Sequence, residues 1–218
     1  MGILIRIENV SFTYPNGVQA LKDVSLSVNE GDFLLITGEN GSGKTTLLWI
    51  MAGLIFPQKG IVLFEGKPLT ERALEDEKFS LWFRRRVGIL FQEPDVQLFS
   101  PTVGEDIAFG PARTGLDDVQ GRVMRAADLM DITDLLGRPP YHLSWGQKRR
   151  AAMATLLSMD HEVLLLDEPM AGLDARGKRT LLDVLERFRS SGKTVVAVSH
   201  EDSELGGLFT RKISLSAL

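Results

Sequence analysis

The chain of 218 residues contains no cysteine, which excludes a disulfide framework and metal sites built from thiolates. It also lacks a long hydrophobic run. The longest, LLWIMAGLIF at residues 47–56, is too short to cross a bilayer and is more typical of a buried helix. The N-terminal MGILIRIENV carries early charges and no apolar core, so it does not resemble a signal peptide. We therefore expect a soluble chain whose membrane role, if it has one, depends on a partner.

An excess of positive charge is likewise absent. The chain has 25 basic and 29 acidic residues and a net charge of −4, so no overall basic field recruits nucleic acid. The run Arg84-Arg85-Arg86 fits a solvated face in such a chain. The hydrophobic fraction of 44% and the charged fraction of 25% are typical of a globular protein with a substantial core.

Hydrophobic periodicity predicts an α/β chain. Alternating residues near the N-terminus predict two strands joined by a turn at residues 15–17. Continuous apolar runs predict buried strands at residues 33–37, 87–92, 163–167 and 194–199, and a last strand-like piece covers 211–218. Helical patterns are expected from Lys44, over much of 71–136, from Ser144 to Met159, and at 175–191. Strands that alternate with helices favour a parallel sheet covered on both faces.

A glycine-rich turn follows the first predicted buried strand and opens a helix. Its sequence, GENGSGKT, fits the pattern G-x-x-x-x-G-K-[ST]. Glycines let successive N–H groups face one anion, and the helix N-terminus adds positive potential. Lys44 would reach the terminal phosphates and the Thr45 hydroxyl would ligate Mg²⁺. The predicted nucleoside triphosphate site comprises Gly38, Glu39, Asn40, Gly41, Ser42, Gly43, Lys44, Thr45 and Thr46.

Polar side chains follow the other predicted buried strands. VLLLDEP ends with Asp167 and Glu168, at the strand end that lies beside a phosphate loop in such sheets. Asp167 would hold Mg²⁺ through water, and Glu168 would orient the attacking water as a general base. Gln92 could reach the metal or the water, or be a solvated amide. His200 would lie near the γ-phosphate, although a lone histidine is more often structural.

The motifs GENGSGKT, a glutamine after GILF, LSWGQ, LLLDEP, AGLD and a strand-end Ser-His occur in the order seen in ATP-binding cassette (ABC) ATPases. The chain resembles that family over nearly its whole length. The resemblance implies one domain at 1–218 with the P-loop NTPase fold and Mg²⁺-dependent hydrolysis of ATP. Residues 1–92 and 163–218 would form the nucleotide-binding core, with an N-terminal antiparallel β part beside the mainly parallel sheet. Residues 93–160 would form a helical subdomain.

LSWGQ resembles the family's LSGGQ signature, which closes over the ATP held by another subunit. It comprises Leu143, Ser144, Trp145, Gly146 and Gln147. Ser144 can cap the helix, and Gly146 can present its N–H to an anion. Trp145 departs from the family, which usually has glycine there. A positive φ would cost tryptophan roughly 1–2 kcal/mol, so we predict a negative φ with the indole directed away from the phosphate. Trp145 would either pack within its own chain or buttress the partner.

Two further residues resemble family positions. Tyr14 in SFTYPNG resembles the aromatic residue that stacks on adenine, although packing of the turn is the alternative role. Asp174 in AGLD resembles the residue that communicates across the dimer interface. Both halves of a composite site are present, so a homodimer is the simplest expectation, with a sister ATPase as the alternative. The preference between ATP and GTP stays open.

Residues 91–111, FQEPDVQLFSPTVGEDIAFGP, resemble the energy-coupling factor (ECF) branch, whose ATPases serve cobalt, nickel and vitamin uptake. The likeness implies a peripheral protein on the cytoplasmic face of a prokaryotic cell membrane. Its partners would be a transmembrane T-component-like subunit and a substrate-capture membrane subunit. Leu98, Phe99 and Val103 would contact a coupling helix or belong to the core. Many ATPases of this branch carry a C-terminal extension that helps them dimerise. If closure of the dimer depends on such an extension, we expect the isolated dimer of this chain to be weak.

Other functions fit less well. An ATPase of another ABC importer or exporter would share the same motifs. A soluble ABC-type ATPase acting on DNA or ribosomes usually needs a long coiled-coil insert or two cassettes, and neither is present. A small-molecule kinase would not explain LSWGQ or AGLD. The transported substrate is chosen by other subunits, so the sequence does not identify it.

Overall fold

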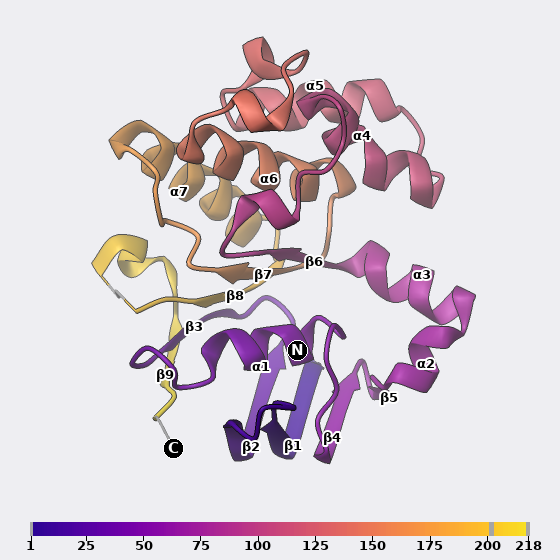
Figure 1. The fold of residues 1–218 in the computed structure, drawn as a ribbon, viewed down its shortest axis with the longest axis vertical. Coiled ribbons are helices and arrows are strands. Elements are labelled where there is room, and N and C mark those ends of the chain that lie inside the picture. The colour runs from indigo at the N-terminus through magenta and orange to yellow at the C-terminus, as the bar shows by residue number, and fades with distance from the viewer. Residues whose placement is uncertain (1, 201–202, 217–218) are drawn as a thin grey trace.

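The computed structural model describes residues 2–200 and 203–216, which form two sheets and their covering helices (Figure 1). The antiparallel sheet has the strand order β2-β1-β4-β5. Its strands are β1 (Ile3–Thr13), β2 (Gln19–Asn29), β4 (Lys59–Phe64) and β5 (Lys67–Pro68). The predicted turn joins β1 to β2. Strands β4 and β5 were not predicted, because the first half of β4 is exposed and its alternation is weak.

The second sheet is parallel, as predicted, with the order β6-β7-β8-β3-β9. Its strands are β6 (Val87–Leu90), β7 (Val163–Asp167), β8 (Thr194–Val198), β3 (Phe33–Thr37) and β9 (Arg211–Ser214). Strand β6 ends at Leu90, two residues earlier than predicted, and β8 ends at Val198. The parallel register brings the carboxyl ends of these strands to one edge.

Helices cover this sheet unevenly. They are α1 (Lys44–Met51), α2 (Glu71–Glu75), α3 (Glu77–Arg86), α4 (Val103–Thr114), α5 (Val119–Leu129), α6 (Trp145–Met159) and α7 (Ala175–Ser190). Figure 1 shows α1 and the antiparallel sheet on one side of the parallel sheet and α4 to α7 on the other. The arrangement thus agrees with the fold that the resemblance implied: a parallel sheet, an antiparallel β part beside it and a helical layer.

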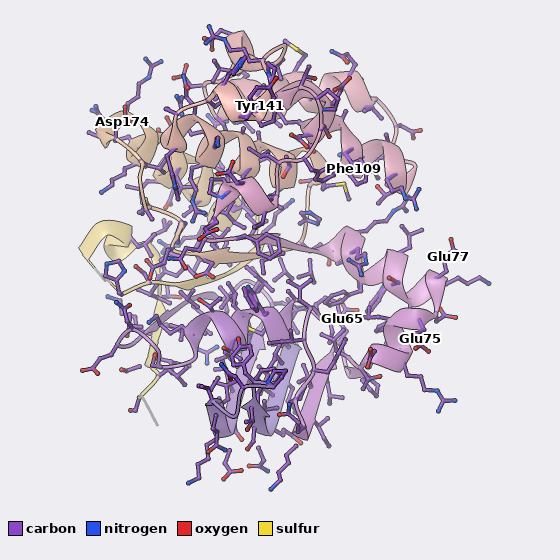
Figure 2. The ribbon with its side chains drawn as sticks, viewed as in Figure 1. Glu65, Glu75, Glu77, Phe109, Tyr141 and Asp174 are labelled. Carbon is purple, nitrogen blue, oxygen red and sulfur yellow. The ribbon has the colours of Figure 1, made fainter. Side chains whose placement is uncertain are left out.

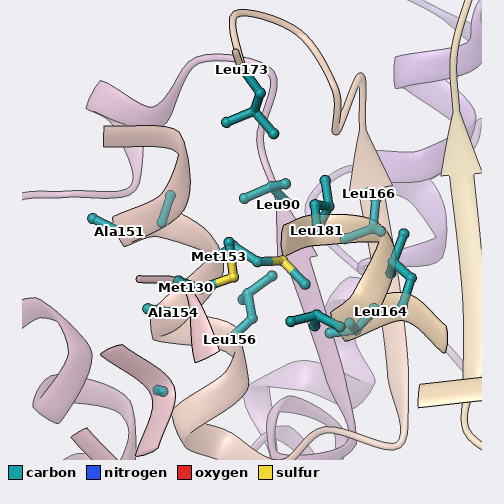
Figure 3. Packing of buried hydrophobic residues seen from close by; sticks show 14 of the residues in the cluster. Leu90, Met130, Ala151, Met153, Ala154, Leu156, Leu164, Leu166, Leu173 and Leu181 are labelled. Carbon is teal, nitrogen blue, oxygen red and sulfur yellow. The ribbon is translucent and has the colours of Figure 1, made fainter. Parts of the chain in front are cut away.

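The two faces of the parallel sheet bury two separate cores. Alternate residues of β7 divide between them: Leu164 and Leu166 pack with α6 and α7, whereas Leu165 packs with α1 and the antiparallel sheet. Figure 3 shows the first core, where Met153 of α6 and Leu181 of α7 lie over β7. Burial on both faces explains why these strands are continuous apolar runs.

The apolar run at residues 47–56 is helical only in its first half. Helix α1 ends at Met51, and Gly53 then adopts a φ of 64° that turns the chain. The prediction of one buried helix over the whole run was therefore wrong. Among residues 2–200 and 203–216, no helix is both long and apolar enough to span a membrane.

His161 lies in the short segment between α6 and β7 and is buried against the edge strand β6. Its side chain is only 4% exposed, and its ring packs on Gly88, where a Cβ atom would lie 2.3 Å from the imidazole. Its Nδ1 lies 3.1 Å from the carbonyl oxygen of Arg85. The pKa of His161 is lowered to about 4, mainly by burial and to a smaller extent by Lys193, while the contact with the Arg85 carbonyl and the charge of Asp160 oppose this.

We expect this histidine to make stability depend on pH. In the unfolded chain His161 binds a proton below about pH 6.5, whereas in the folded chain it does so only below about pH 4. The free energy of unfolding should therefore fall by about 3 kcal/mol as the pH drops through that window. Urea denaturation at several pH values would measure this for the wild type and for His161→Gln, which should lack this part of the slope. Replacing the exposed His142 by glutamine is the control, and an equal slope in His161→Gln would contradict the assignment.

Candidate functional site

The loop between β3 and α1 curls tightly around its own lysine. Gly41 and Gly43 have φ values of 83° and 89°, in the region that favours glycine. A Cβ atom on Gly43 would also lie 2.3 Å from the carbonyl oxygen of Ala20. The Lys44 ammonium group is inside the loop and donates to the carbonyl oxygens of Gly38 at 2.8 Å and Glu39 at 2.9 Å. The loop thus directs backbone N–H groups and one cation into the same space.

A cleft of about 330 Å³ joins this loop to other predicted residues. Its lining comprises Tyr14, Val18, Ala20, Asn40, Gly41, Gly43, Lys44, Thr45, Thr46, Gln92 and Glu168. These residues come from the turn between β1 and β2, from β2, from the phosphate loop and the start of α1, and from the segments that follow β6 and β7. The structure therefore brings most of the predicted nucleotide site together.

Asp167 lies at the bottom of the site. Its side chain is 1% exposed, and its Oδ1 accepts a hydrogen bond of 3.3 Å from the Thr45 hydroxyl. Burial raises the pKa of Asp167, and the hydrogen bond from Thr45 opposes this. The other oxygen, Oδ2, is buried and has no hydrogen-bond partner within the described part of the chain. A buried carboxylate oxygen of this kind, next to a hydroxyl, fits a divalent cation that prefers oxygen ligands.

Glu168 is held by the neighbouring strand β8 in a strained backbone conformation. Its φ is 45°, which for this residue type costs roughly 1–3 kcal/mol. Its N–H donates to the carbonyl of Val198 at 3.0 Å. Its Oε2 accepts from the Ser199 hydroxyl at 3.1 Å, and its Oε1 accepts from the backbone N–H of His200 at 2.9 Å and lies 3.0 Å from His200 Nδ1. Several contacts thus fix the carboxylate at the mouth of the cleft.

Tyr14 and Gln92 border the same cleft from opposite sides. The Tyr14 hydroxyl lies 2.9 Å from Thr46 Oγ1, and its ring packs edge-on against Phe12 at 4.9 Å. Tyr14 therefore packs in the turn while it also lines the cleft. Gln92 is exposed and follows the end of β6, so it belongs to a loop rather than to the strand.

The signature segment begins α6 with a reciprocal cap. Ser144 Oγ accepts from the N–H of Gln147 at 3.3 Å, and Gln147 Oε1 accepts from the N–H of Ser144 at 2.9 Å. Leu143 is buried beneath this turn, and Gly146 approaches the carbonyl of Gly172. None of the signature residues, all of them in the described part, lines the cleft of its own chain.

Trp145 is the first residue of α6 and is not among the described residues with positive φ, which confirms the predicted backbone conformation. Its indole packs on Gly172, where a Cβ atom would lie 2.6 Å from the ring. The residue remains 42% exposed. The indole therefore packs within its own chain and keeps an exposed surface, and a role toward the partner stays a prediction.

Asp174 caps the next helix. Its Oδ1 accepts from the N–H of Gly177 at 2.7 Å, at the start of α7. Figure 2 shows Asp174 at the edge of the molecule. A role in dimer communication stays a prediction for this residue.

The predicted surface for a coupling helix needs correction. Leu98 and Val103 are buried and belong to the core cluster that also contains residues of α5 and α6, so they are not surface contacts. Phe99 alone of the predicted trio is exposed, at 66%. It packs edge-on against Phe109 of α4 with ring centroids 4.9 Å apart, and Val96 is exposed nearby in sequence. The sequence reasoning missed Phe109, which lies on the far side of the helical layer from Asp174 in Figure 2.

Arg149 was also missed. It is 1% exposed on α6, and its guanidinium donates to backbone carbonyls at the ends of β6 and β7, including those of Gln92 and Glu168. The sequence signal is weak: Arg149 is the middle residue of a basic triplet, Lys148-Arg149-Arg150, of the kind typical of a helix surface.

The sequence is similar to those of known ATP-binding proteins, in agreement with the geometry of the site. Residues 21–171 match the model of the family described as ABC transporter. The nickel import ATP-binding protein LarO of Lactiplantibacillus plantarum is 40% identical, over 96% of this chain and 88% of LarO. The energy-coupling factor transporter ATP-binding protein EcfA of Carboxydothermus hydrogenoformans is 42% identical, over 92% of this chain and 73% of EcfA.

A solved structure shares the fold. The ATP-binding cassette MJ0796, solved as a dimer in a post-hydrolysis state with ADP and phosphate, superposes with a TM-score of 0.88. It is 27% identical, and the match covers 98% of this chain and 96% of MJ0796.

The phosphate loop offers a matched pair of glycines for a test. Both have positive φ, but a Cβ atom on Gly41 would meet nothing within 4 Å, whereas one on Gly43 would clash with backbone. Gly41→Ala should lower the free energy of unfolding by about 1 kcal/mol, and Gly43→Ala by roughly 3 kcal/mol. Chemical denaturation of both variants measures the difference. Equal losses of the free energy of unfolding in the two variants would show that the close approach of Gly43 to β2 does not determine the conformation of the loop.

Proposed function

This chain belongs to the ABC transporter family of ATP-hydrolysing subunits, and from that premise we propose that it powers ECF-type uptake of a transition metal ion, such as nickel or cobalt, or of a vitamin. The observation that carries the ATPase part is the single cleft that joins the phosphate loop, Gln92 and Glu168. The names of the relatives LarO and EcfA support the uptake part.

In this proposal ATP enters the cleft with its adenine on the Tyr14 ring and its phosphates in the loop. The N–H groups of the loop and of the first turn of α1 bind the phosphate oxygens. Lys44 exchanges its contacts with the Gly38 and Glu39 carbonyls for the terminal phosphates. Because the lysine is already inside the loop, it needs to move only its terminal atoms.

The residues that would hold Mg²⁺ are Thr45, Gln92 and Asp167. The unpaired Oδ2 of Asp167 and the adjacent Thr45 hydroxyl support this assignment. When bound, the ion would neutralise charge on the terminal phosphates. Burial raises the pKa of Asp167, and a cation bound beside it would favour the ionised form, so we expect binding of the metal and nucleotide to be coupled to ionisation of this carboxyl.

Glu168 is the proposed general base. Its carboxylate is oriented by Ser199 and His200, and the strained φ turns its side chain toward the cleft. As water attacks the terminal phosphorus atom, its proton passes to Glu168, and the bond between that phosphorus and the bridging oxygen of ADP breaks. His200 then acts by holding Glu168 in place, and it also borders the hollow beside Gly38.

Two copies of the chain would complete two sites. The capped N-terminus of α6 presents N–H groups beside Ser144 and Gly146, away from its own cleft. In a dimer this helix end would meet the ATP of the other subunit. The dimeric structure of MJ0796 supports this arrangement, and a sister ATPase could supply the second half equally well.

The exposed Phe99 and Phe109 are the proposed contact for a T-component-like membrane subunit. The two rings form one exposed apolar feature, and an amphipathic helix binds such features through its apolar face. The chain would then lie on the cytoplasmic face of the membrane, held by that subunit, while a substrate-capture subunit selects the cargo.

We expect Glu168→Gln to lower the rate of ATP hydrolysis by at least about 100-fold, because the amide cannot accept the proton from water. Binding of ATP should be retained, since the phosphate loop is unchanged. Phosphate release and equilibrium binding measure the two quantities. Glu186→Gln, at an exposed position of α7, is the control. Unchanged hydrolysis in Glu168→Gln would remove this residue from the mechanism.

The transport role has its own test. The tagged chain, purified from gently solubilised membranes of its host, should recover a polytopic membrane protein identified by mass spectrometry. Phe99→Asp should lower this recovery, whereas aspartate at Leu81, which is 40% exposed on α3, should not. Recovery of only ribosomal or DNA-bound material would contradict transport, and a partner of another transporter class would contradict the ECF assignment.

A further inference from the structure

Arg149 is a cation in a buried position, where a charged group is energetically unfavourable. It lies one helical turn after Trp145 on α6 and is 1% exposed. Its partners are backbone carbonyls: Nη1 donates to Phe91 and Gln92, and Nη2 donates to Asp167 and Glu168. Its Nε is buried without a partner in the described part of the chain. Burial lowers the pKa of Arg149 to about 10, and the negative charges of Asp167 and Glu168 oppose this.

The carbonyls that Arg149 binds belong to two separate segments. Strand β6 ends at Leu90 and β7 ends at Asp167, so the following peptide groups leave the ladder of the sheet. Buried carbonyls at such ends need donors from elsewhere. The planar guanidinium, with its donors in a fixed fork, can reach both segments at once, which a lysine cannot do with the same geometry.

These two segments carry residues on either side of the proposed reaction centre. Gln92 borders the cleft from the end of β6, and Glu168 borders it from the end of β7. Each is bonded to Arg149 through its own carbonyl oxygen. The Arg149 side chain therefore acts together with the sheet to set the distance between the backbone at Gln92 and the backbone at Glu168.

The same helix carries the signature segment. The Arg149 guanidinium lies 5.6 Å from the centre of the Trp145 ring, and that ring packs on Gly172 in the segment that follows Glu168. The tryptophan thus covers the arginine on the side of the helix N-terminus. A displacement of this first turn would move the guanidinium together with the carbonyls that it binds.

We propose that Arg149 is a positioning residue that sets the separation of Gln92 and Glu168 and couples the N-terminal turn of α6 to the hydrolytic centre of its own chain. This inference rests on the roles proposed for Gln92 and Glu168. It differs from a purely structural role because it requires that a substitution of Arg149 lower the rate of the chemical step more than it lowers the affinity for the nucleotide.

Kinetics on the full chain separate the two roles. Arg149→Met keeps an apolar stem but removes every donor, and Arg149→Lys keeps the charge with fewer contacts. We expect the kcat for ATP hydrolysis to fall about 100-fold and about 10-fold respectively, because small misplacements at a reaction centre have effects of this size. The Kd for ATP should stay within about twofold of the wild-type value, since the phosphate loop makes no contact with Arg149.

Arg150 supplies the matched control. It lies on the same helix but donates to the carbonyls of Met130 and Asp131, away from the cleft. Arg150→Met and Arg150→Lys should therefore leave kcat unchanged. Wild-type kcat in Arg149→Met, an equal fall in the Arg150 variants, or parallel losses of kcat and ATP affinity would each overturn the proposal.

Hydrogen exchange tests the contact itself without relying on turnover. The amides of residues 91–93, 168 and 170–172 should exchange faster in Arg149→Lys than in the wild type, while amides of β3 and of the phosphate loop should not change. The Arg150 variants should match the wild type in both regions. Unchanged exchange at 91–93, 168 and 170–172 would overturn the proposal. A wild-type chain that fails to hydrolyse ATP would count against the proposed function instead, and the exchange result would still decide whether Arg149 holds the two segments.

Discussion

The register of the parallel sheet is the constraint on which the site depends. Ile36 pairs with Val198, Asp167 pairs with the same residue, and Leu90 pairs with Leu166, so the strands end at one level. The residues that follow these strands are consequently neighbours in space although they are far apart in the sequence. A slip of this register would separate the acid pair from the phosphate loop even if every motif were intact.

Strain and unpaired polar groups collect at this same edge. Glu168 has a left-handed backbone, Asp167 keeps a buried oxygen without a hydrogen-bond partner among the described residues, and Arg149 is a buried cation whose hydrogen bonds go to backbone carbonyls. Each feature is unfavourable alone. The two apolar cores on either face of the sheet stabilise the framework that holds them, and the hydrogen bonds from Ser199 and His200 offset part of the strain at Glu168.

The signature helix connects two regions that the motifs suggest are separate. Its capped N-terminus does not line the cleft of its own chain, yet Trp145 and Arg149 attach its first turns to the segments around the acid pair. The tryptophan is compatible with this position because the first residue of a helix has a negative φ. A large aromatic ring at that point adds contact with Gly172 without obstructing the amides of the helix end.

Local features of the sequence determined the phosphate loop, the buried strands and the capped start of α6, because each depends on residues close together in the chain. Glycine spacing specifies a turn, a continuous apolar run specifies a strand buried on both faces, and Ser144 with Gln147 specifies a cap. Tertiary structure decided the features that depend on distant partners. Strand β4 forms by pairing with β1, and Leu98 and Val103 are buried in a core that also contains residues of α5 and α6. Arg149 resembles a surface residue in the sequence, and only the approach of two strand ends to α6 makes it a buried donor.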